Sequence, residues 1–446
     1  MTPENIVAVV IVLTVFLGLL AIRFHVGLSL MLSGLVGISI LRSTGTGIST
    51  VTNAPYSASY NYSLVIIPLF ILMGVLAVRS GLAQAGFDLA SRLLKKLPGG
   101  AALASLAGSG LFAAVTGSSV ATVATMARVS TTAIVRAGHS IQLAAGVVCA
   151  GGTLGVLIPP SIVLVLYGVV TGESIGRLLL AGIGPGLLTI AAYAATIIVL
   201  VLIARRKTPG EPDSLSNPRV EAVEDVKLDL MGGAYLAVIF SVSIGTIYLG
   251  VATPTEAASF GALAALIIFI IRTKLPKIVH ELKESLSEAV GLTAMTFLLI
   301  AGAGVFTYFL AISGASTALV NVITSSDASP YVVLILCLLL LLPLGMFLDG
   351  ISMILIAAPL LHQILTSYGF DGIWLAVLIV KVAEMALITP PVGMNIFVYS
   401  GAVKGASIST AFRGVMPFIL ADFVVVAIII AVPDIVTFLP DLSGAK

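Results

Sequence analysis

The stretch from Cys149 to Ile162 has the clearest chemical potential, although it lies inside a long apolar segment. Pro159 and Pro160 lack backbone donors and their rings clash with the preceding turn, so an undisturbed α-helix cannot run through them. Gly151 and Gly152 lower the cost of leaving helical geometry. At membrane depth, the freed backbone groups persist only where protein or a water-filled cavity receives them, and transporters use such groups to hold ions or anions. The alternative interpretation is a proline kink retained for helix packing.

A second proline pair, Pro390-Pro391, interrupts another apolar run. Thr389 and Asn395 can offer side-chain oxygens beside the carbonyls that this break frees. Ser161, directly after Pro160, and Asn395 are placed to donate to a substrate carboxylate, helped by the positive N-terminal end of the following half-helix. The two breaks together therefore predict an ion and anion site.

Lys381 and Glu384 lie three residues apart, just before the second break, and so share a helix face. A salt bridge between them, which neutralises both charges, is the simpler interpretation. The alternative is that Glu384 senses a cation bound at the break.

Small residues dominate the run from Ala107 to Ala127. In its middle, Gly117, Ser118 and Ser119 predict the tip of a re-entrant hairpin that presents hydroxyls and free backbone groups. The alternative is close helix–helix packing through small residues. The hairpin is favoured because a later apolar run, 345–359, is also interrupted by glycine, aspartate and proline.

Asp349 lies within that later run and is followed by Gly350 and Ser352. An aspartate in hydrocarbon is costly unless it is paired or binds a ligand, and hard oxygen donors suit a hard cation. We therefore expect Asp349 in the shell of an ion site or directly behind it. The alternative is a buried cap on a half-helix, through the backbone amides of Ile351 or Ser352, and the two roles are compatible.

The composition predicts an integral membrane protein with an all-α fold. The 446 residues are 59% hydrophobic and 9% charged, whereas soluble domains carry about 25% charged residues. Apolar runs of about 20 residues recur along the chain, which predicts roughly ten to twelve spanning helices and excludes the alternating pattern of a barrel. The net charge of +2 comes from scattered residues and forms no basic stripe for nucleic acid. No nucleophile–base pair, phosphate loop or metal-ligand spacing indicates an enzyme.

The two halves of the chain repeat. Ser80-Gly81 matches Ser313-Gly314 at 313 − 80 = 233 residues, and Gly117 matches Gly350 at 350 − 117 = 233 residues. The proline pairs are 390 − 159 = 231 residues apart. Interrupted segments at corresponding places in two halves point to a transport site at the repeat interface.

We divide the chain into a first repeat over 1–204, a polar linker over 205–229 and a second repeat over 230–446. Each half is predicted to cross the membrane five times and to hold one re-entrant hairpin. Because five is odd, the second half is inverted relative to the first. The Lys and Arg residues of the short loops place the linker in the cytoplasm and residue 1 outside.

Four further features carry expectations. The stretch 43–63 has no Lys or Arg and is drawn as a long outer loop. Residues 82–97 and 277–288 are predicted to lie at the membrane interface, although ordinary amphipathic connectors explain them equally well. Arg128 and Arg136, at the far end of the first hairpin, could meet an anionic substrate, but inside-positive topology explains them as well.

Several of these stretches resemble the signature stretches of the large membrane subunit of tripartite ATP-independent periplasmic (TRAP) transporters. The resemblance runs the full length of the chain. Its strongest parts are Ala150-Gly-Gly-Thr-Leu-Gly-Val-Leu-Ile-Pro-Pro-Ser-Ile, Ala181-Gly-Ile-Gly-Pro-Gly, Met346-Phe-Leu-Asp-Gly and Ile388-Thr-Pro-Pro-Val-Gly-Met-Asn.

The resemblance implies an elevator-type Na⁺ symporter in the bacterial inner membrane. A transport domain with two hairpins and two broken helices would move past a scaffold. The implied partners are a small four-helix membrane subunit, a soluble periplasmic substrate-binding protein and a small carboxylate substrate, all in the setting of the lipid bilayer.

The resemblance also implies two Na⁺ sites, one at each hairpin tip. The first joins Gly117, Ser118 and Ser119 to the break at Gly151-Gly152-Thr153, and the second joins Asp349, Gly350 and Ser352 to the break at Thr389. Members of the family commonly have proline and Gly-Tyr where this chain has Thr131-Thr132 and Gly138-His139, and a neutral residue near Lys381. These differences concern the substrate and not the class.

Two other functions fit the same features less well. One is a Na⁺/dicarboxylate symporter of related architecture that needs no binding protein. The other is a channel or a non-transporting scaffold. A channel needs a continuous pore lined by polar rings, whereas paired breaks favour an occluded site.

Overall fold

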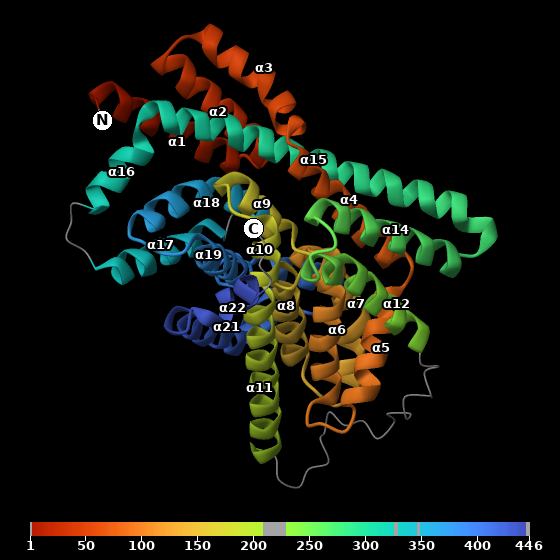
Figure 1. Ribbon diagram of the computed structural model, residues 1–446. Helices are drawn as coiled ribbons and strands as arrows, with labels where there is room; N and C mark the ends of the chain where they lie inside the picture. Colours follow the sequence, from red (N-terminus) through yellow and green to blue (C-terminus); the bar gives the residue numbers. More distant parts are fainter. Residues whose placement is uncertain (1, 208–228, 325–328, 346–347, 443–446) are drawn as a thin grey trace.

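The computed structural model describes residues 2–207, 229–324, 329–345 and 348–442. Within these ranges every regular element is a helix, and Figure 1 follows them from the red N-terminal part to the blue C-terminal part. The predicted all-α fold is confirmed. The predicted linker falls largely on residues 208–228, which lie outside the described ranges.

Among the described residues, eight helices are long and apolar enough to cross a membrane, or nine if the bent pair α8 (Ile141–Leu157) and α9 (Ile162–Thr171) is one span. The number is lower than ten to twelve because other apolar helices, including α2 (Val26–Leu41), have only 10–17 residues. The eight helices are α1 (Pro3–Ala21), α4 with its 3₁₀ start (Tyr62–Arg79), α10–α11 (Ile175–Arg206), α12–α13 (Met231–Tyr248), α14 (Pro254–Arg272), α15 with its 3₁₀ start (Leu275–Ser313), α18 (Gly350–Ser367) and α21 (Ile408–Ala431).

The first predicted hairpin is present. It consists of α6 (Gly100–Thr116) and α7 (Ser119–Arg136), joined by a two-residue turn. Gly117 in this turn has φ 59°, a left-handed conformation that glycine adopts without strain. Ser118 caps α7, because its side chain accepts a hydrogen bond from the backbone amide of Ala121 (3.4 Å).

The second predicted hairpin is also present. It consists of α17 (Pro330–Gly345) and α18, and Asp349 is the N-cap of α18. Met346, the first residue of the signature stretch in this turn, lies outside the described residues.

Two helices are interrupted where the proline pairs occur, so the kink within a continuous helix is excluded. The axis bends by 43° between α8 and α9. In the second half, α19 (Gly372–Ala386) and α20 (Met394–Ala402) are separated by Leu387–Gly393. The peptide bonds Pro159-Pro160 and Pro390-Pro391 are both cis.

Both halves show the same order of elements: a hairpin, a broken helix and then a long helix, which is α11 (Ile183–Lys207) in the first half and α21 in the second. Glycines in the left-handed conformation recur at the spacing of the sequence anchors. The pairs are Gly81 and Gly314 (314 − 81 = 233), Gly138 and Gly369 (369 − 138 = 231), and Gly172 and Gly405 (405 − 172 = 233). The boundaries of the repeats and their inverted orientation stay predictions.

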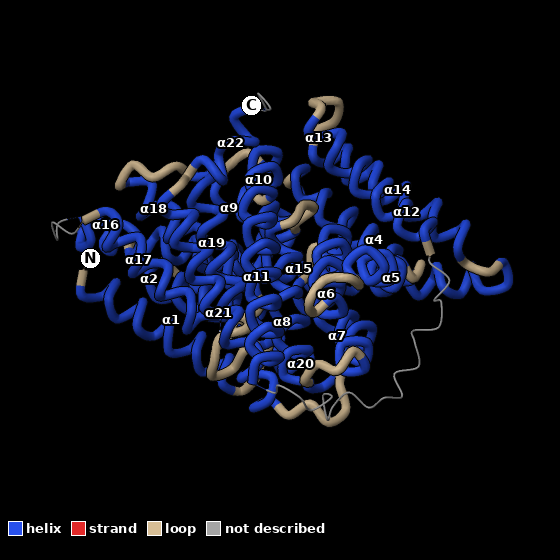
Figure 2. The backbone as a smooth tube through the Cα atoms, turned by 90° about the horizontal axis from the view of Figure 1, so that it is seen from below, coloured by secondary structure: helices blue, strands red, loops and turns tan. Residues whose placement is uncertain are grey.

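The helices form two groups. One group, which we call the frame, consists of α1, α2, α4, α12, α14 and α15, and α15 crosses the upper part of the molecule in Figure 1 and packs on α2 and α4. The other, which we call the hairpin unit, consists of α6–α9, α11 and α17–α21, and α5 packs between its helix α6 and the frame helix α12. Figure 2 shows α8, α11 and α19 in the middle, between α1 and α2 on one side and α12 and α14 on the other.

One expectation is wrong. The stretch 43–63 is not a loop, because Thr44–Tyr60 forms α3, which Ser43 caps and which packs on α2 and α15. Its Ser, Thr and Gly residues show no apolar periodicity, so packing decides its helical state. Residues 278–288 are the first part of α15, which runs unbroken over Ile278–Ser313, and their interfacial position stays a prediction. Residues 82–97 contain α5 (Leu82–Leu94), which packs on α6 and α12.

Ion pairs hold four helix ends at one level of the frame. Arg79, at the end of α4, lies 2.8 Å from Glu288 of α15. Arg272, at the end of α14, donates to the Ser80 carbonyl (2.8 Å) and pairs with Asp229 before α12 (2.6 Å). The Arg272 guanidinium holds the pKa of the Asp229 carboxyl below its usual value. Arg79 and Arg272 thus lie together, as their assignment to one side of the membrane requires.

The crossing of α2 and α15 depends on two glycines. A Cβ added at Gly302 would overlap the carbonyl oxygen of Gly27, whereas one added at Gly304 meets nothing within 4 Å. Gly302→Ala is therefore expected to lower the free energy of unfolding by about 1–3 kcal/mol through overpacking. Gly304→Ala is the matched control, and detergent-titration unfolding measures both. Equal losses in the two variants would contradict this crossing.

Candidate functional site

The first hairpin tip lies against the first helix break. A Cβ placed on Gly117 would lie 2.8 Å from the carbonyl oxygen of Pro160, so this contact requires glycine. A Cβ on Gly155 would lie 3.5 Å from the carbonyl oxygen of Ser118. The structure therefore brings together Gly117, Ser118 and Pro160, which the sequence assigned to an ion site and a substrate site.

Ser119 and Asn395 join this tip to the second broken helix. The Asn395 Nδ2 atom donates to Ser119 Oγ (2.9 Å) and to the Cys149 carbonyl (3.4 Å). A Cβ on Gly152 would lie 3.1 Å from the carbonyl oxygen of Ser119. These side chains come from α7, α8 and α20, and those of Ser119 and Asn395 are buried. The first predicted ion site and Asn395 are thus one constellation.

Two other residues of the first predicted site have different neighbours. Gly151 faces α6, because a Cβ there would lie 2.8 Å from Ser109 Oγ. The Thr153 hydroxyl donates to the Ala150 carbonyl (2.7 Å) and lies 3.2 Å from the Tyr193 hydroxyl. Thr153 therefore belongs to a second polar cluster, described below.

At the second hairpin tip, Asp349 is the N-cap of α18, which is the alternative role that the sequence suggested for it. Its Oδ2 atom accepts from the backbone amides of Ile351 (3.2 Å) and Ser352 (3.4 Å), and the Ser352 hydroxyl donates to its Oδ1 atom. The residue of α19 that meets this tip is Glu384. A Cβ on Gly350 would lie 2.8 Å from Glu384 Oε1.

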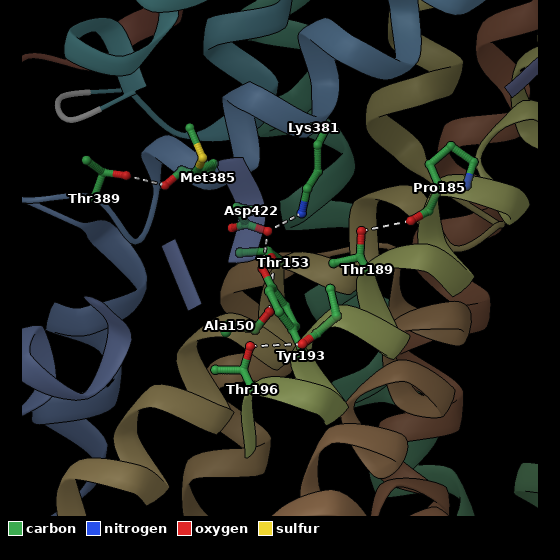
Figure 3. A network of polar contacts seen from close by, with 11 residues as sticks. Ala150, Thr153, Pro185, Thr189, Tyr193, Thr196, Lys381, Met385, Thr389 and Asp422 are labelled. Carbon is green, nitrogen blue, oxygen red and sulfur yellow. Dashed lines mark hydrogen bonds and ion pairs between the residues drawn. The ribbon is translucent and has the colours of Figure 1, made fainter. Parts of the chain in front are cut away.

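The second break carries Thr389, whose hydroxyl donates to the Met385 carbonyl (2.7 Å), as Figure 3 shows. The oxygen lone pairs of this hydroxyl remain available to a cation. Ser161, at the first break, caps α9 by accepting from the backbone amide of Leu164 (3.1 Å). Its hydroxyl hydrogen can still be donated to a ligand.

Four helix N-termini converge on this region. The first residues of α7, α9, α18 and α20 are Ser119, Ile162, Gly350 and Met394. Gly117 packs against the start of α9, and Ser119 bonds to the start of α20. Helix N-termini carry partial positive charge and free amides, which favour an anion, while the carbonyls and hydroxyls of the breaks favour a hard cation.

A buried charged network lies beside the breaks and is shown in Figure 3. Lys381 Nζ lies 2.5 Å from Asp422 Oδ1 and 5.4 Å from the centre of the Tyr193 ring. The Tyr193 hydroxyl donates to the same Asp422 oxygen (2.7 Å). Lys381, Asp422 and Tyr193 are each 0% exposed. The network links α19, α21, α11 and, through Thr153, α8.

This network corrects the simpler sequence interpretation of Lys381. The lysine pairs with Asp422 of α21 and not with Glu384 on its own helix. Sequence reasoning missed Asp422 and Tyr193 as members of the site. The sequence could have identified Asp422, because an aspartate inside an apolar spanning segment is a candidate functional residue.

Arg128, predicted to bind substrate, is exposed on α7. It lies 128 − 119 = 9 residues from the tip, or about 13 Å along the helix. The structure therefore does not bring it to the tips. Farther along α7, Arg136 lines a cavity of about 1180 Å³ with other basic residues, and Asp88 is the one carboxylate among its described lining residues. The basic residues are Arg92, Lys95, Arg136, Arg205 and Arg413, together with His139.

Comparison with known proteins agrees with this architecture. The sequence family described as the tripartite ATP-independent periplasmic transporter, DctM component, matches residues 13–435. The C4-dicarboxylate TRAP transporter large permease protein DctM of Pseudomonas aeruginosa is 34% identical over 93% of this chain and 94% of its own length. The sialic acid TRAP transporter large permease protein SiaM of Vibrio cholerae is 29% identical over 96% of this chain and 97% of its own length.

The crystal structure of the Alcanivorax borkumensis YdaH transporter, described as having an unusual topology, has the same fold, with a TM-score of 0.61. It shares 14% sequence identity over 87% of this chain and 88% of the other. The protein is thus a multi-pass membrane transporter subunit and not an enzyme. The chain belongs to the TRAP transporter family as a large membrane subunit.

The Lys381–Asp422 pair gives a stability prediction. Lys381→Met or Asp422→Leu alone is expected to lower the free energy of unfolding by about 3–5 kcal/mol, because each leaves one buried charge unpaired. The double variant is expected to recover most of this loss, since an apolar pair replaces the ions. Detergent-titration unfolding measures the three variants.

The matched control is Arg177→Met, which removes the surface ion pair with Asp441 (2.8 Å). Its expected cost is about 1 kcal/mol or less. A double variant no more stable than the single variants would show that the pair is not the coupled unit described here.

Proposed function

We propose that this TRAP large membrane subunit imports a small organic acid across the bacterial inner membrane, driven by Na⁺ and by an elevator movement. The observation that carries the proposal is the convergence of four helix N-termini and the freed groups of the buried first break on one region, with the partly exposed second break beside it. Such a region can hold an anion and a cation together, which symport requires.

The cation part of the proposal is two Na⁺ sites, one at each tip. The first uses the oxygens around Gly117, Ser118, Ser119 and the break after Gly152, and the second uses those around Asp349-Gly350, Ser352 and Thr389. These are hard oxygen donors on small residues, and the tip of each hairpin is close-packed on a helix of the hairpin unit. Bound Na⁺ would tie each tip to its helix.

The substrate part of the proposal is a carboxylate near Ser161 and Asn395. The names of the two relatives refer to C4-dicarboxylates and to sialic acid, and both carry a carboxylate. The basic cavity around Arg136 lies beyond the tip along α7 and suits an anion that leaves toward the cytoplasm.

The elevator part of the proposal follows from where the site residues lie. All of the predicted ion-site residues, together with Ser161 and Asn395, lie on the hairpin unit, and none lies on the frame. The network from Lys381 to Thr153 connects four helices of that unit. Because the hairpin unit contains all of these residues and has its own internal contacts, it can move past the frame while the site residues keep their relative positions.

The proposed partners are a small four-helix membrane subunit and a periplasmic substrate-binding protein. Reconstitution of the chain with both partners is expected to give uptake of a small carboxylate that requires an inward Na⁺ gradient. Radiolabelled uptake into liposomes, with Na⁺ replaced by choline as the control, measures this. Equal uptake without the binding protein would instead support a symporter that works alone, and uptake without Na⁺ would remove the coupling.

Asp349→Ala is expected to weaken the Na⁺ dependence of uptake and to cost about 1 kcal/mol of stability, because the cap of α18 is lost. Asp349→Asn is the matched variant, since asparagine is an equally good cap without the charge. Na⁺ titration of uptake measures both. An unchanged titration in Asp349→Ala would remove this residue from the ion site.

A further inference from the structure

Glu384 is a buried carboxylate for which the described residues offer no dedicated counter-charge. Its side chain is 1% exposed. The nearby Lys381 ammonium lies 2.5 Å from Asp422 and is therefore committed to that carboxylate. The ionisable groups that face Glu384 are Lys381, Asp349 and Asp422. With Glu384 included, this set has a formal charge of 1 − 3 = −2 when all four groups are ionised.

The three carboxylates differ in how they are satisfied. Asp422 has the lysine and the Tyr193 hydroxyl, both on Oδ1, while its Oδ2 atom has no hydrogen-bond partner among the described residues. Asp349 has two backbone amides and the Ser352 hydroxyl at the start of α18. Glu384 Oε1 packs against Gly350, but Oε2 is buried without any hydrogen-bond partner. An isolated buried carboxylate is costly, so Glu384 is neutralised either by a proton or by a bound cation.

A second unpartnered oxygen lies in the same cluster. Asn395 Oδ1 is buried without a partner, while its Nδ2 atom donates to Ser119 Oγ (2.9 Å). The Ser119 side chain also interacts with the Glu384 carboxylate. Glu384 and Asn395 therefore reach the same hydroxyl from two different half-helices, α19 and α20.

The free atoms of this cluster are acceptors. A carboxylate oxygen, an amide oxygen and a hydroxyl oxygen are the donor set of a hard monovalent cation, and they repel the carboxylate of a substrate. We propose that Glu384 is the charged ligand of a third cation site, completed by Asn395 Oδ1 and Ser119 Oγ, between the two tip sites. This proposal rests on the proposed Na⁺ coupling and adds a site to it.

The position of this site gives it a coupling role. Ser119 begins the second arm of the first hairpin, and Gly350, at the tip of the second hairpin, packs against the Glu384 carboxylate. A cation held by Glu384 is therefore next to both tips at once. Its arrival favours closure of both hairpins over the substrate, because each tip site alone touches only one hairpin.

A binding experiment tests the site. Purified protein is titrated with Na⁺ at constant ionic strength with choline, and the rise in unfolding temperature reports binding. Glu384→Gln is expected to raise the half-saturating Na⁺ concentration about tenfold or more, because a charged ligand becomes neutral. Glu256→Gln is the matched control: Glu256 lies in the capping box of α14 on the frame, where glutamine is also accepted.

Two further variants keep the test decisive if Glu384→Gln does not fold. Asn395→Ala removes a proposed ligand that neither tip site uses, the Oδ1 atom, and leaves the carboxylate in place. Gly350→Ala moves the Glu384 carboxylate, because the added Cβ would lie 2.8 Å from Oε1. Both are expected to weaken Na⁺ binding, and wild-type titrations in all three variants would overturn the proposal.

A transport experiment identifies the ion. In liposomes that contain the complete transporter, the reversal potential gives the number of Na⁺ ions carried per substrate, and Glu384→Gln is expected to carry one fewer. An unchanged Na⁺ number combined with a lost proton dependence would assign the site to a proton and overturn the Na⁺ assignment. Absence of any Na⁺ dependence in the wild type would instead refute the proposed function itself, so the two failures are distinguishable.

Discussion

The structure depends on one constraint, which is that hydrocarbon cannot satisfy a free backbone amide or carbonyl. The proline pairs free such groups at two places, where protein or water must receive them. Protein covers the first break, because Pro159 and Pro160 are buried and Gly117 packs on the carbonyl of Pro160. At the second break Pro390 and Pro391 are exposed, and the second tip packs with Gly350 beside Glu384 of α19. Glycine is needed at both tips because a side chain would hold the hairpin away from the helix that it covers.

The same constraint applies to charge, and the structure meets it in two different ways. Lys381 and Asp422 satisfy one another inside the hairpin unit, with the Tyr193 hydroxyl on the shared oxygen. Each member of that pair has a charged partner, although the Asp422 Oδ2 atom has no hydrogen-bond partner in the described part of the chain. Glu384 differs in having no charged partner of its own among the residues that the structure describes, and its Oε2 atom also has no hydrogen-bond partner there. An ion pair whose members neutralise each other is suited to joining helices. A buried carboxylate without a counter-charge is suited to a position where a cation binds and leaves during a transport cycle.

The frame and the hairpin unit are stabilised by different sets of contacts. The frame is held by close helix crossings, as at Gly27 and Gly302, and by ion pairs at helix ends, as at Arg79 and Glu288. The hairpin unit is held by its own tip contacts and by the buried network. Because each group is stabilised internally, relative movement of the two groups does not require either to unfold.

The sequence by itself determined the membrane class, the helical fold, the two breaks and the two hairpins, because apolar runs, proline pairs and glycine-rich turns act through local chemistry. It also offered the cap role of Asp349 as an alternative to an ion-site role, since a cap depends only on the next three residues. It did not determine the partner of Lys381, the helical state of 44–60 or the meeting of Ser119, Asn395 and Glu384. Those features depend on which segments become neighbours in space, and only the tertiary structure decides that. Lys381 and Asp422 are 41 positions apart and Ser119 and Asn395 are 276 positions apart, yet each pair is joined by a hydrogen bond.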